Sequence, residues 1–162
     1  MKIERYDLRD DGLVPNNPSL PLTVYRSAID ASAPGAEQRF ISRFGENDWS
    51  GAWINGIYRY HHYHATAHEV LGIAAGEARV QFGGPNGPIV AVTAGDAVMI
   101  PAGVGHCCKS ASADLSVVGA YPGGADYDTQ QATPEARIKS LPLIAAVPPP
   151  KRDPVLSDPR SS

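Results

Sequence analysis

The sequence contains few cysteines, and the two that it has are neighbours, Cys107 and Cys108. A disulfide between adjacent residues is strained, so this pair cannot form the network of bridges that holds small secreted domains together. With 162 residues, the chain is long enough to bury a hydrophobic core without bridges. We therefore expect a single compact unit in a reducing compartment, the cytoplasm.

Long hydrophobic runs and clusters of positive charge are also missing. The first residues, MKIERYDLRDDG, interleave charged and apolar side chains, and no apolar run approaches the roughly 20 residues that span a membrane. Lysine and arginine number 14 against 17 aspartates and glutamates, which gives a formal charge of −3. These features predict no signal peptide, no membrane partner and no nucleic-acid partner.

Glycine and proline, in contrast, are abundant, with 16 and 15 residues respectively. So many turn-forming residues argue against a helical bundle. Between Trp49 and Tyr121 the chain consists of short β-prone runs separated by turns, such as EARVQFG, GPIVAVTAG and DAVMIPAG. This texture predicts an all-β fold, an antiparallel sandwich or barrel with one or two short flanking helices.

The segments on either side of the β-rich region differ from it in pattern. Residues 1–45 are expected to form an N-terminal arm with one strand and a short helix over 36–44, where apolar residues share one helical face. Residues 46–125 are expected to form the β-barrel. We expect no second domain.

The C-terminal segment, 126–162, is expected to begin with a helix of one or two turns. Thr133 is a suitable N-cap residue, and Pro134 fits the first helical position. From Pro142 onward the proline-rich sequence favours an extended tail.

The histidines are placed unevenly, with one crowded group and one separate residue. The crowded group is His61, His62, His64 and His68, and the separate residue is His106. His62 and His64 are two residues apart, so on a strand their side chains leave the same face. Glu69 begins the next β-prone run and can face this pair across a turn. Imidazole and carboxylate groups together bind divalent metal ions, and His106 could join them if the chain folds back.

The histidine-rich segment and the segment around His106 resemble the two sequence motifs of the cupins. The first motif, Gly-x5-His-x-His-x3–4-Glu-x6-Gly, is matched by Gly56, His62, His64, Glu69 and Gly76. The second, Gly-x5-Pro-x-Gly-x2-His-x3-Asn, is matched by Gly95, Pro101, Gly103 and His106, with Ser110 in place of the final Asn. The strings HHYHATAHEVLG, GGPNGP and IPAGVGH are similar to small bacterial cupins of the YjlB-like group.

The resemblance implies a double-stranded β-helix, or jelly roll, with one divalent metal ion inside one mouth. Its protein ligands would be His62, His64, Glu69 and His106. Iron is the expected metal, although Mn, Ni, Cu and Zn tolerate the same ligands. Such a site would leave two positions open for water, dioxygen or a bidentate substrate. The alternative is a degenerate cupin that has lost its ion.

The alternation of side chains along a strand predicts different positions for other residues near the motifs. His61 and His68 have the opposite parity to His62 and Glu69, so we expect them to be exposed or to lie behind the ligands. The two cysteines are expected to be buried packing, although Cys108 shares the parity of His106 and could face the cavity.

Tyr58 and Tyr60 share the parity of His62, which makes them the predicted catalytic residues. A phenol there could orient a substrate or donate a proton. The alternative is that the two rings simply fill the barrel.

The expected function is that of a mononuclear metal-dependent enzyme, an Fe(II)-type dioxygenase acting on a small organic molecule. Two alternatives stay open: a redox-silent metal-dependent isomerase or lyase, and a non-catalytic protein that binds a small molecule. Resemblance to small cupins further implies a homodimer, formed through sheet edges or exchanged N-terminal strands.

Overall fold

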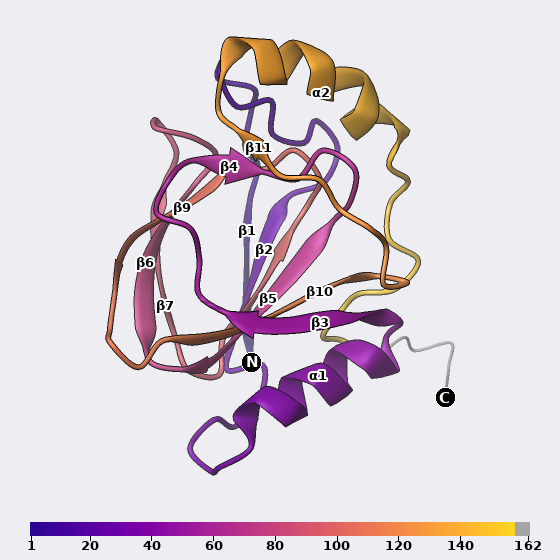
Figure 1. Ribbon diagram of the computed structural model, residues 1–162. Helices are drawn as coiled ribbons and strands as arrows, with labels where there is room; N and C mark the ends of the chain where they lie inside the picture. The colour runs from indigo at the N-terminus through magenta and orange to yellow at the C-terminus, as the bar shows by residue number, and fades with distance from the viewer. Residues whose placement is uncertain (158–162) are drawn as a thin grey trace.

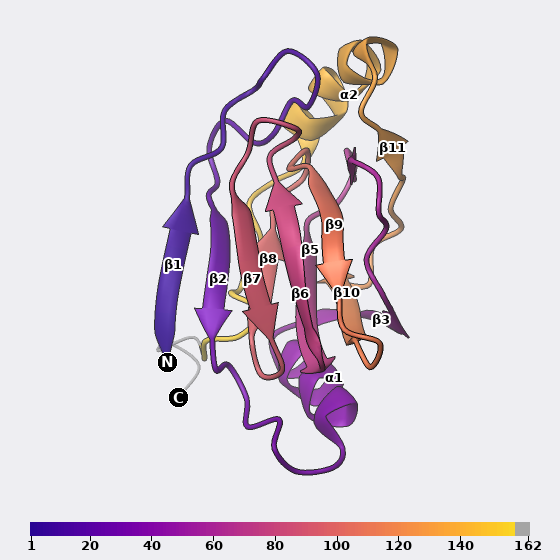
Figure 2. The same cartoon turned by 90° about the vertical axis from the view of Figure 1, so that its left-hand side faces the viewer.

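The computed structural model describes residues 1–157 and shows two antiparallel β-sheets packed face to face (Figures 1 and 2). The six-stranded sheet has the order β1 (Lys2–Tyr6), β2 (Leu22–Arg26), β8 (Ala97–Ile100), β5 (Glu69–Ala75), β10 (Ser116–Pro122) and β3 (Trp49–Asn55). The five-stranded sheet has the order β11 (Gln130–Gln131), β4 (His62–Tyr63), β9 (His106–Ala111), β6 (Glu77–Phe82) and β7 (Ile89–Thr93). Neighbouring strands are mostly distant in sequence, so the chain crosses repeatedly between the sheets. This is the predicted jelly roll.

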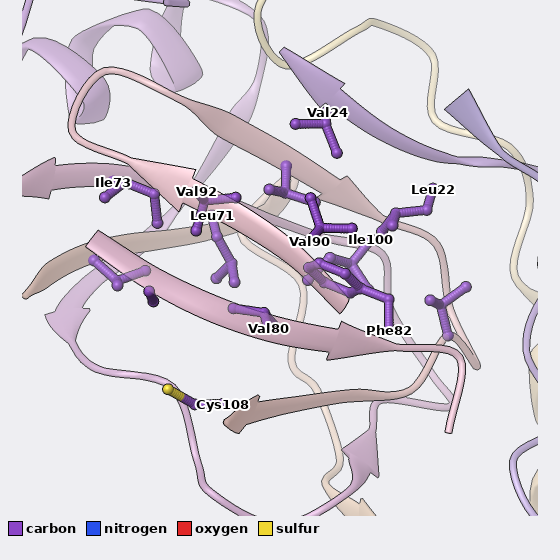
Figure 3. Close-up of a cluster of buried hydrophobic side chains, with 14 residues drawn as sticks. Leu22, Val24, Leu71, Ile73, Val80, Phe82, Val90, Val92, Ile100 and Cys108 are labelled. Carbon is purple, nitrogen blue, oxygen red and sulfur yellow. The ribbon is translucent and has the colours of Figure 1, made fainter. Parts of the chain in front are cut away.

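The main hydrophobic core fills the space between the two sheets (Figure 3). In β7 the side chains alternate, with Val90 and Val92 buried and their neighbours exposed, as expected for a strand with one face on the core. Cys108 belongs to this core and packs with Val80 and Phe82. Its thiol is therefore a packing group between the sheets and not part of the cavity described below.

A second apolar cluster covers the outer face of the six-stranded sheet. The helix α1 (Ala36–Glu46) lies across β3, β5 and β10 and buries Phe40 and Phe44 there (Figure 1). Gly72 makes this close contact possible, because a Cβ at that position would lie 2.5 Å from the Phe40 ring. The helix predicted over 36–44 is confirmed, and it continues for two further residues.

The N-terminal arm contributes two strands to the six-stranded sheet, where the sequence predicted one. β2 pairs with β8, and β1 pairs with β2 at the edge. The additional strand is β1, whose sequence KIERY is rich in charge. Its charged side chains have partners on the same sheet, since Arg26 of β2 bonds to Glu4 at 3.0 Å, and this pairing favours the strand.

The C-terminal helix α2 (Pro134–Ala146) begins as predicted but ends later (Figure 1). The Thr133 hydroxyl accepts a hydrogen bond from Ala136 N at 3.1 Å, which confirms the N-cap. Pro142, where the extended tail was predicted to start, lies inside the helix instead. An internal proline costs about 3 kcal/mol, and burial of Ile144 against Val14, Tyr63 and Ala65 offsets that cost.

The tail after α2 packs along the molecule as an extended segment. Val155 joins the cluster under α1, and the Trp49 indole donates to the carbonyl of Arg152 at 3.0 Å. The last part of the predicted tail, 158–162, lies outside the described residues. Within residues 1–157, no helix combines the length and the hydropathy needed to cross a membrane.

Candidate metal centre

The four predicted ligands come from both sheets and meet in the space between them. His62 lies on β4 directly opposite His106 on β9, and His64 follows the end of β4. Glu69 is the first residue of β5 in the opposite sheet. All four side chains are buried. The fold therefore brings together residues that are far apart in the sequence, as the motif spacing predicted.

The distances among these side chains are those of one compact cluster. One ring nitrogen from each of the three histidines lies within 4.8 Å of the other two. Glu69 Oε2 is 3.3 Å from His64 Nε2, and Glu69 Oε1 is 3.4 Å from His106 Nε2. We call His62, His64, Glu69 and His106 the candidate metal centre.

Each histidine is held in one orientation by a backbone carbonyl. His62 Nδ1 bonds to Tyr60 O at 2.9 Å, His64 Nδ1 to Asp128 O at 2.6 Å, and His106 Nδ1 to Val104 O at 3.1 Å. Because a carbonyl oxygen only accepts, each Nδ1 must carry the proton. In the neutral imidazole, Nε2 then has a free lone pair, which is the arrangement that metal-ligating histidines share.

The electrostatics favour a neutral His62 imidazole beside an ionised Glu69 carboxylate. Burial, together with the nearby His106, lowers the pKa of His62 to about 3. Burial alone would raise the pKa of Glu69, but the His106 and His64 rings beside its carboxylate hold that pKa below its usual range. For His64, burial lowers the pKa, and the bond to Glu69 outweighs that effect and raises it.

This donor set fits a divalent cation. With all three imidazoles neutral, three nitrogen lone pairs and one carboxylate face one another, and a positive charge is needed to relieve the repulsion. A proton on His64 relieves it in part. A divalent metal ion would satisfy all four groups, and imidazole with carboxylate suits the first-row metals from manganese to zinc.

Tyr121 on β10 holds Glu69 from behind. Its hydroxyl donates to Glu69 Oε2 at 2.6 Å and accepts from Trp53 Nε1 at 2.7 Å. Burial and the carboxylate raise the pKa of Tyr121, so the phenol keeps its proton. The sequence did not predict this role, because nearly all of β10 is buried and shows no alternation that would single out one side chain.

A cavity of about 350 Å³ opens onto the candidate metal centre. Tyr58, one of the two predicted catalytic residues, lines it and stands edge-on to His62, with ring centroids 5.2 Å apart. Tyr60 stacks on Tyr58 but is not among the described lining residues. Tyr127, which the sequence pattern did not single out, lines the opening beside His64, with ring centroids 5.1 Å apart.

The remaining histidines do not reach the candidate metal centre. His68 is fully buried, where the sequence predicted an exposed residue or one behind the ligands. Its Nδ1 accepts from Ala102 N at 2.9 Å, and its Nε2 donates to Pro148 O at 2.8 Å, so it fastens the C-terminal tail. His61 is half-buried and lies outside the cavity lining.

Asp128 connects the segment after β10 to the turn that follows β4. Its carbonyl orients His64, and its carboxylate accepts hydrogen bonds from Ala65 N at 2.8 Å and from the backbone and hydroxyl of Thr66. One residue thus fixes both the turn and the ligand next to it. Nothing in the sequence around Asp128 identifies this role, because its partners in the turn and His64 lie more than 60 positions away.

Comparison with known proteins agrees with the fold and the motifs. Residues 55–118 match the family described as Cupin domain. The chain is 42% identical over 152 residues to the Bacillus subtilis (strain 168) protein named Uncharacterized protein YjlB, an alignment that covers 94% of this chain and 89% of that protein.

Among solved structures, acireductone dioxygenase from Bacillus anthracis is similar to this chain, with 13% sequence identity and a TM-score of 0.46. The match covers 65% of this chain and 80% of that chain. Procruciferin, an 11S globulin from Brassica napus, has 21% identity and a TM-score of 0.40, with 51% of this chain covered. This chain spans only 20% of procruciferin. Neither likeness bears on activity. The matched motif region and the 42% identity along nearly the whole chain show that the protein belongs to the cupin family, together with YjlB.

Proposed function

We propose that this chain binds one divalent metal ion, iron, through His62, His64, Glu69 and His106 and acts as a dioxygenase on a small organic molecule. The observation that supports metal binding most strongly is the set of three hydrogen bonds from Nδ1 atoms to backbone carbonyls. In neutral rings they leave the Nε2 lone pairs free for a cation beside an ionised Glu69.

The metal would supply a Lewis acid and, as iron, a path for electrons from substrate to dioxygen. In a dioxygenation both oxygen atoms enter the product and the substrate supplies the electrons, so no external reductant is needed. The protein's own part is to exclude water with its buried ligands, to hold Glu69 through Tyr121, and to orient the substrate in the cavity.

The cavity lining favours this chemistry over proton transfer. Apart from the candidate metal centre, the titratable side chains among the described lining residues are three phenols, Tyr58, Tyr121 and Tyr127. Tyr121 is bonded on both sides and has a raised pKa, which makes it a poor base. A redox-silent isomerase or lyase that moves a proton of its substrate depends on a general base, whereas the oxygen transfer of a dioxygenase depends on the metal and dioxygen.

The same observation supports a second candidate, a protein that binds a small molecule without converting it. A dioxygenase and a binder are distinguished by oxygen consumption. Iron-loaded protein is expected to consume oxygen in the presence of at least one member of a panel of catechols, diketones, thiols and small organic acids. Zinc-loaded protein serves as the control and is expected to consume none.

The opposite result would rule out dioxygenase activity. If iron is fully bound and no compound causes oxygen uptake, the protein is instead one that binds a small molecule without converting it. Conversion of a compound by the zinc-loaded protein without oxygen would instead establish the isomerase or lyase. The homodimer also stays a proposal, supported by the positions of β1 and β7 at the edges of their sheets.

A further inference from the structure

Two tyrosine rings stand at the mouth of the cavity without being buried by the fold. Tyr58 and Tyr127 are 57% and 45% exposed, although both line the cavity. Each stands edge-on to a different histidine of the candidate metal centre, Tyr58 to His62 and Tyr127 to His64. We call Tyr58 and Tyr127 the mouth tyrosines. Large aromatic surfaces left open beside a reactive centre are typical of ligand contacts.

Each mouth tyrosine is supported from behind by a second ring. Tyr60 stacks on Tyr58 with centroids 5.0 Å apart, and Tyr121 stacks on Tyr127 at 4.2 Å and an interplanar angle of 16°. Tyr121 is itself fixed by its bonds to Glu69 and Trp53. Tyr127 is therefore held in place before any ligand arrives, which reduces the entropy lost on binding, whereas Tyr58 stacks on a ring that is itself 40% exposed.

The rest of the cavity wall is mainly apolar. It includes Trp53, Ile54, Ile57 and Leu71, and Glu69 is the one charged side chain among the described residues that line it. A ligand with several charges would lose its hydration here without gaining an ion pair in return. A flat ring would instead gain contact with aromatic and aliphatic surface, and a volume of about 350 Å³ accommodates one.

From this arrangement we propose that the site takes a planar aromatic molecule with adjacent oxygen donors, whose ring packs against Tyr58 and Tyr127 while the oxygens bind the metal. This inference rests on the proposed metal centre and names the substrate class for it. It assigns a specificity role to the mouth tyrosines through their rings, not their hydroxyl groups.

A matched pair of metal-binding probes tests the proposal. Benzohydroxamate and acetohydroxamate bind a metal through the same two oxygens and differ in the phenyl ring. Zinc-loaded protein is used so that calorimetry reports affinity without oxidation. We expect benzohydroxamate to bind at least about tenfold more tightly than acetohydroxamate.

Variants of the mouth tyrosines separate the ring from the hydroxyl group. Tyr58→Ser and Tyr127→Ser are expected to weaken benzohydroxamate binding more than acetohydroxamate binding, and so to reduce the affinity ratio toward one. Tyr58→Phe and Tyr127→Phe keep the ring and are expected to keep the ratio, which also controls for folding.

Several results would overturn the inference. Bound zinc is measured on the same samples, so that failure of the inference is distinguished from failure of the metal centre. With zinc bound, the inference is overturned if the two hydroxamates bind equally tightly or if neither binds. It is also overturned if the serine variants leave the affinity ratio unchanged. Absence of bound zinc would overturn the metal centre itself and this inference with it. If the serine variants instead shift sedimentation to a smaller species at an unchanged ratio, the mouth tyrosines contact a second copy of the chain.

Discussion

The three histidines of the candidate metal centre are oriented by carbonyls at very different sequence distances. The carbonyls for His62 and His106 belong to Tyr60 and Val104, each two residues earlier in the chain. The carbonyl for His64 belongs to Asp128, which is 64 positions away. Local chain geometry is enough to orient the first two rings, whereas His64 depends on how the segment after β10 is packed. His64 is therefore the candidate ligand whose orientation is most sensitive to changes elsewhere in the chain.

Tyr121→Phe removes the hydrogen bond that the phenol donates to Glu69 but keeps the buried ring. We expect metal affinity to fall by about tenfold or more, because groups that orient metal ligands typically contribute that much. Competition with a chromophoric chelator measures the change. Tyr58→Phe, which removes the hydroxyl of another tyrosine in the cavity lining, is the control, and equal affinities in the two variants would contradict the role given to Tyr121.

Asp128→Ala removes the acceptor for the backbone of Ala65 and Thr66. We expect a loss of about 1 to 3 kcal/mol in the free energy of unfolding, measured by urea denaturation at pH 7. Asp126→Ala, the same substitution at an exposed position of the same segment, is the control. An unfolding midpoint equal to that of the wild type would show that these bonds contribute nothing.

The same carboxylate predicts a dependence on pH. Burial would raise the pKa of Asp128, but hydrogen bonds from Gln130, Thr66 and Ala65 lower it. Because the folded pKa is below the unfolded value of about 3.9, this contribution is present above about pH 4 and is lost as the pH falls further. The stability difference between wild type and Asp128→Ala should therefore shrink on acidification, and a difference that grows would contradict this sign.

At the level of elements, a short strand and a turn set the positions of the side chains in the candidate metal centre. β4 has two residues, and its pairing with β9 sets His62 opposite His106. The turn before β9 is tied to the same place, because Gly103 N donates to His64 O at 2.8 Å. Gly103 has a φ of 89°, and a Cβ there would lie 2.5 Å from the carbonyl oxygen of Asn16. This turn therefore requires glycine for both its conformation and its space.

Gly103→Ala is expected to destabilise the protein more than Gly12→Ala. Gly12 has nearly the same φ, 87°, but a Cβ at that position would meet nothing within 4 Å, so an alanine there carries the backbone strain alone. The additional clash at Gly103 should cost about 1 to 3 kcal/mol, as overpacking does elsewhere. Chemical denaturation of both variants measures the difference, and equal losses of stability would show that the turn has room for a side chain.

The elements also show what the sequence could predict. The His-x-His spacing, Glu69 and the Pro-x-Gly corner before His106, through their resemblance to the cupin motifs, predicted which side chains meet between the sheets. β1, the later end of α2, Tyr121 and Tyr127 were missed, because each depends on contacts made only after folding. Arg26 supports β1, the buried Ile144 offsets Pro142, and Tyr121 is identified only by the carboxylate beside it.

At the scale of the whole molecule, the candidate metal centre joins the two sheets. The histidines come from β4, β9 and the turn after β4, whereas Glu69 belongs to β5 in the six-stranded sheet. The apolar core between the sheets sets their separation, and with it the distance between the carboxylate and the imidazoles. The packing of the core therefore determines the geometry of the candidate metal centre. For this reason a sandwich of two sheets suits such a site.

Elemental analysis of the purified chain beside two histidine variants tests the central claim most directly. His64→Ala removes a ligand of the candidate metal centre, and His61→Ala removes a nearby histidine that is not part of it. We predict about one divalent metal ion per chain in the wild type and in His61→Ala, and a large loss of metal in His64→Ala. Equal metal content in all three proteins, or no metal in the wild type after exposure to iron, would contradict the account.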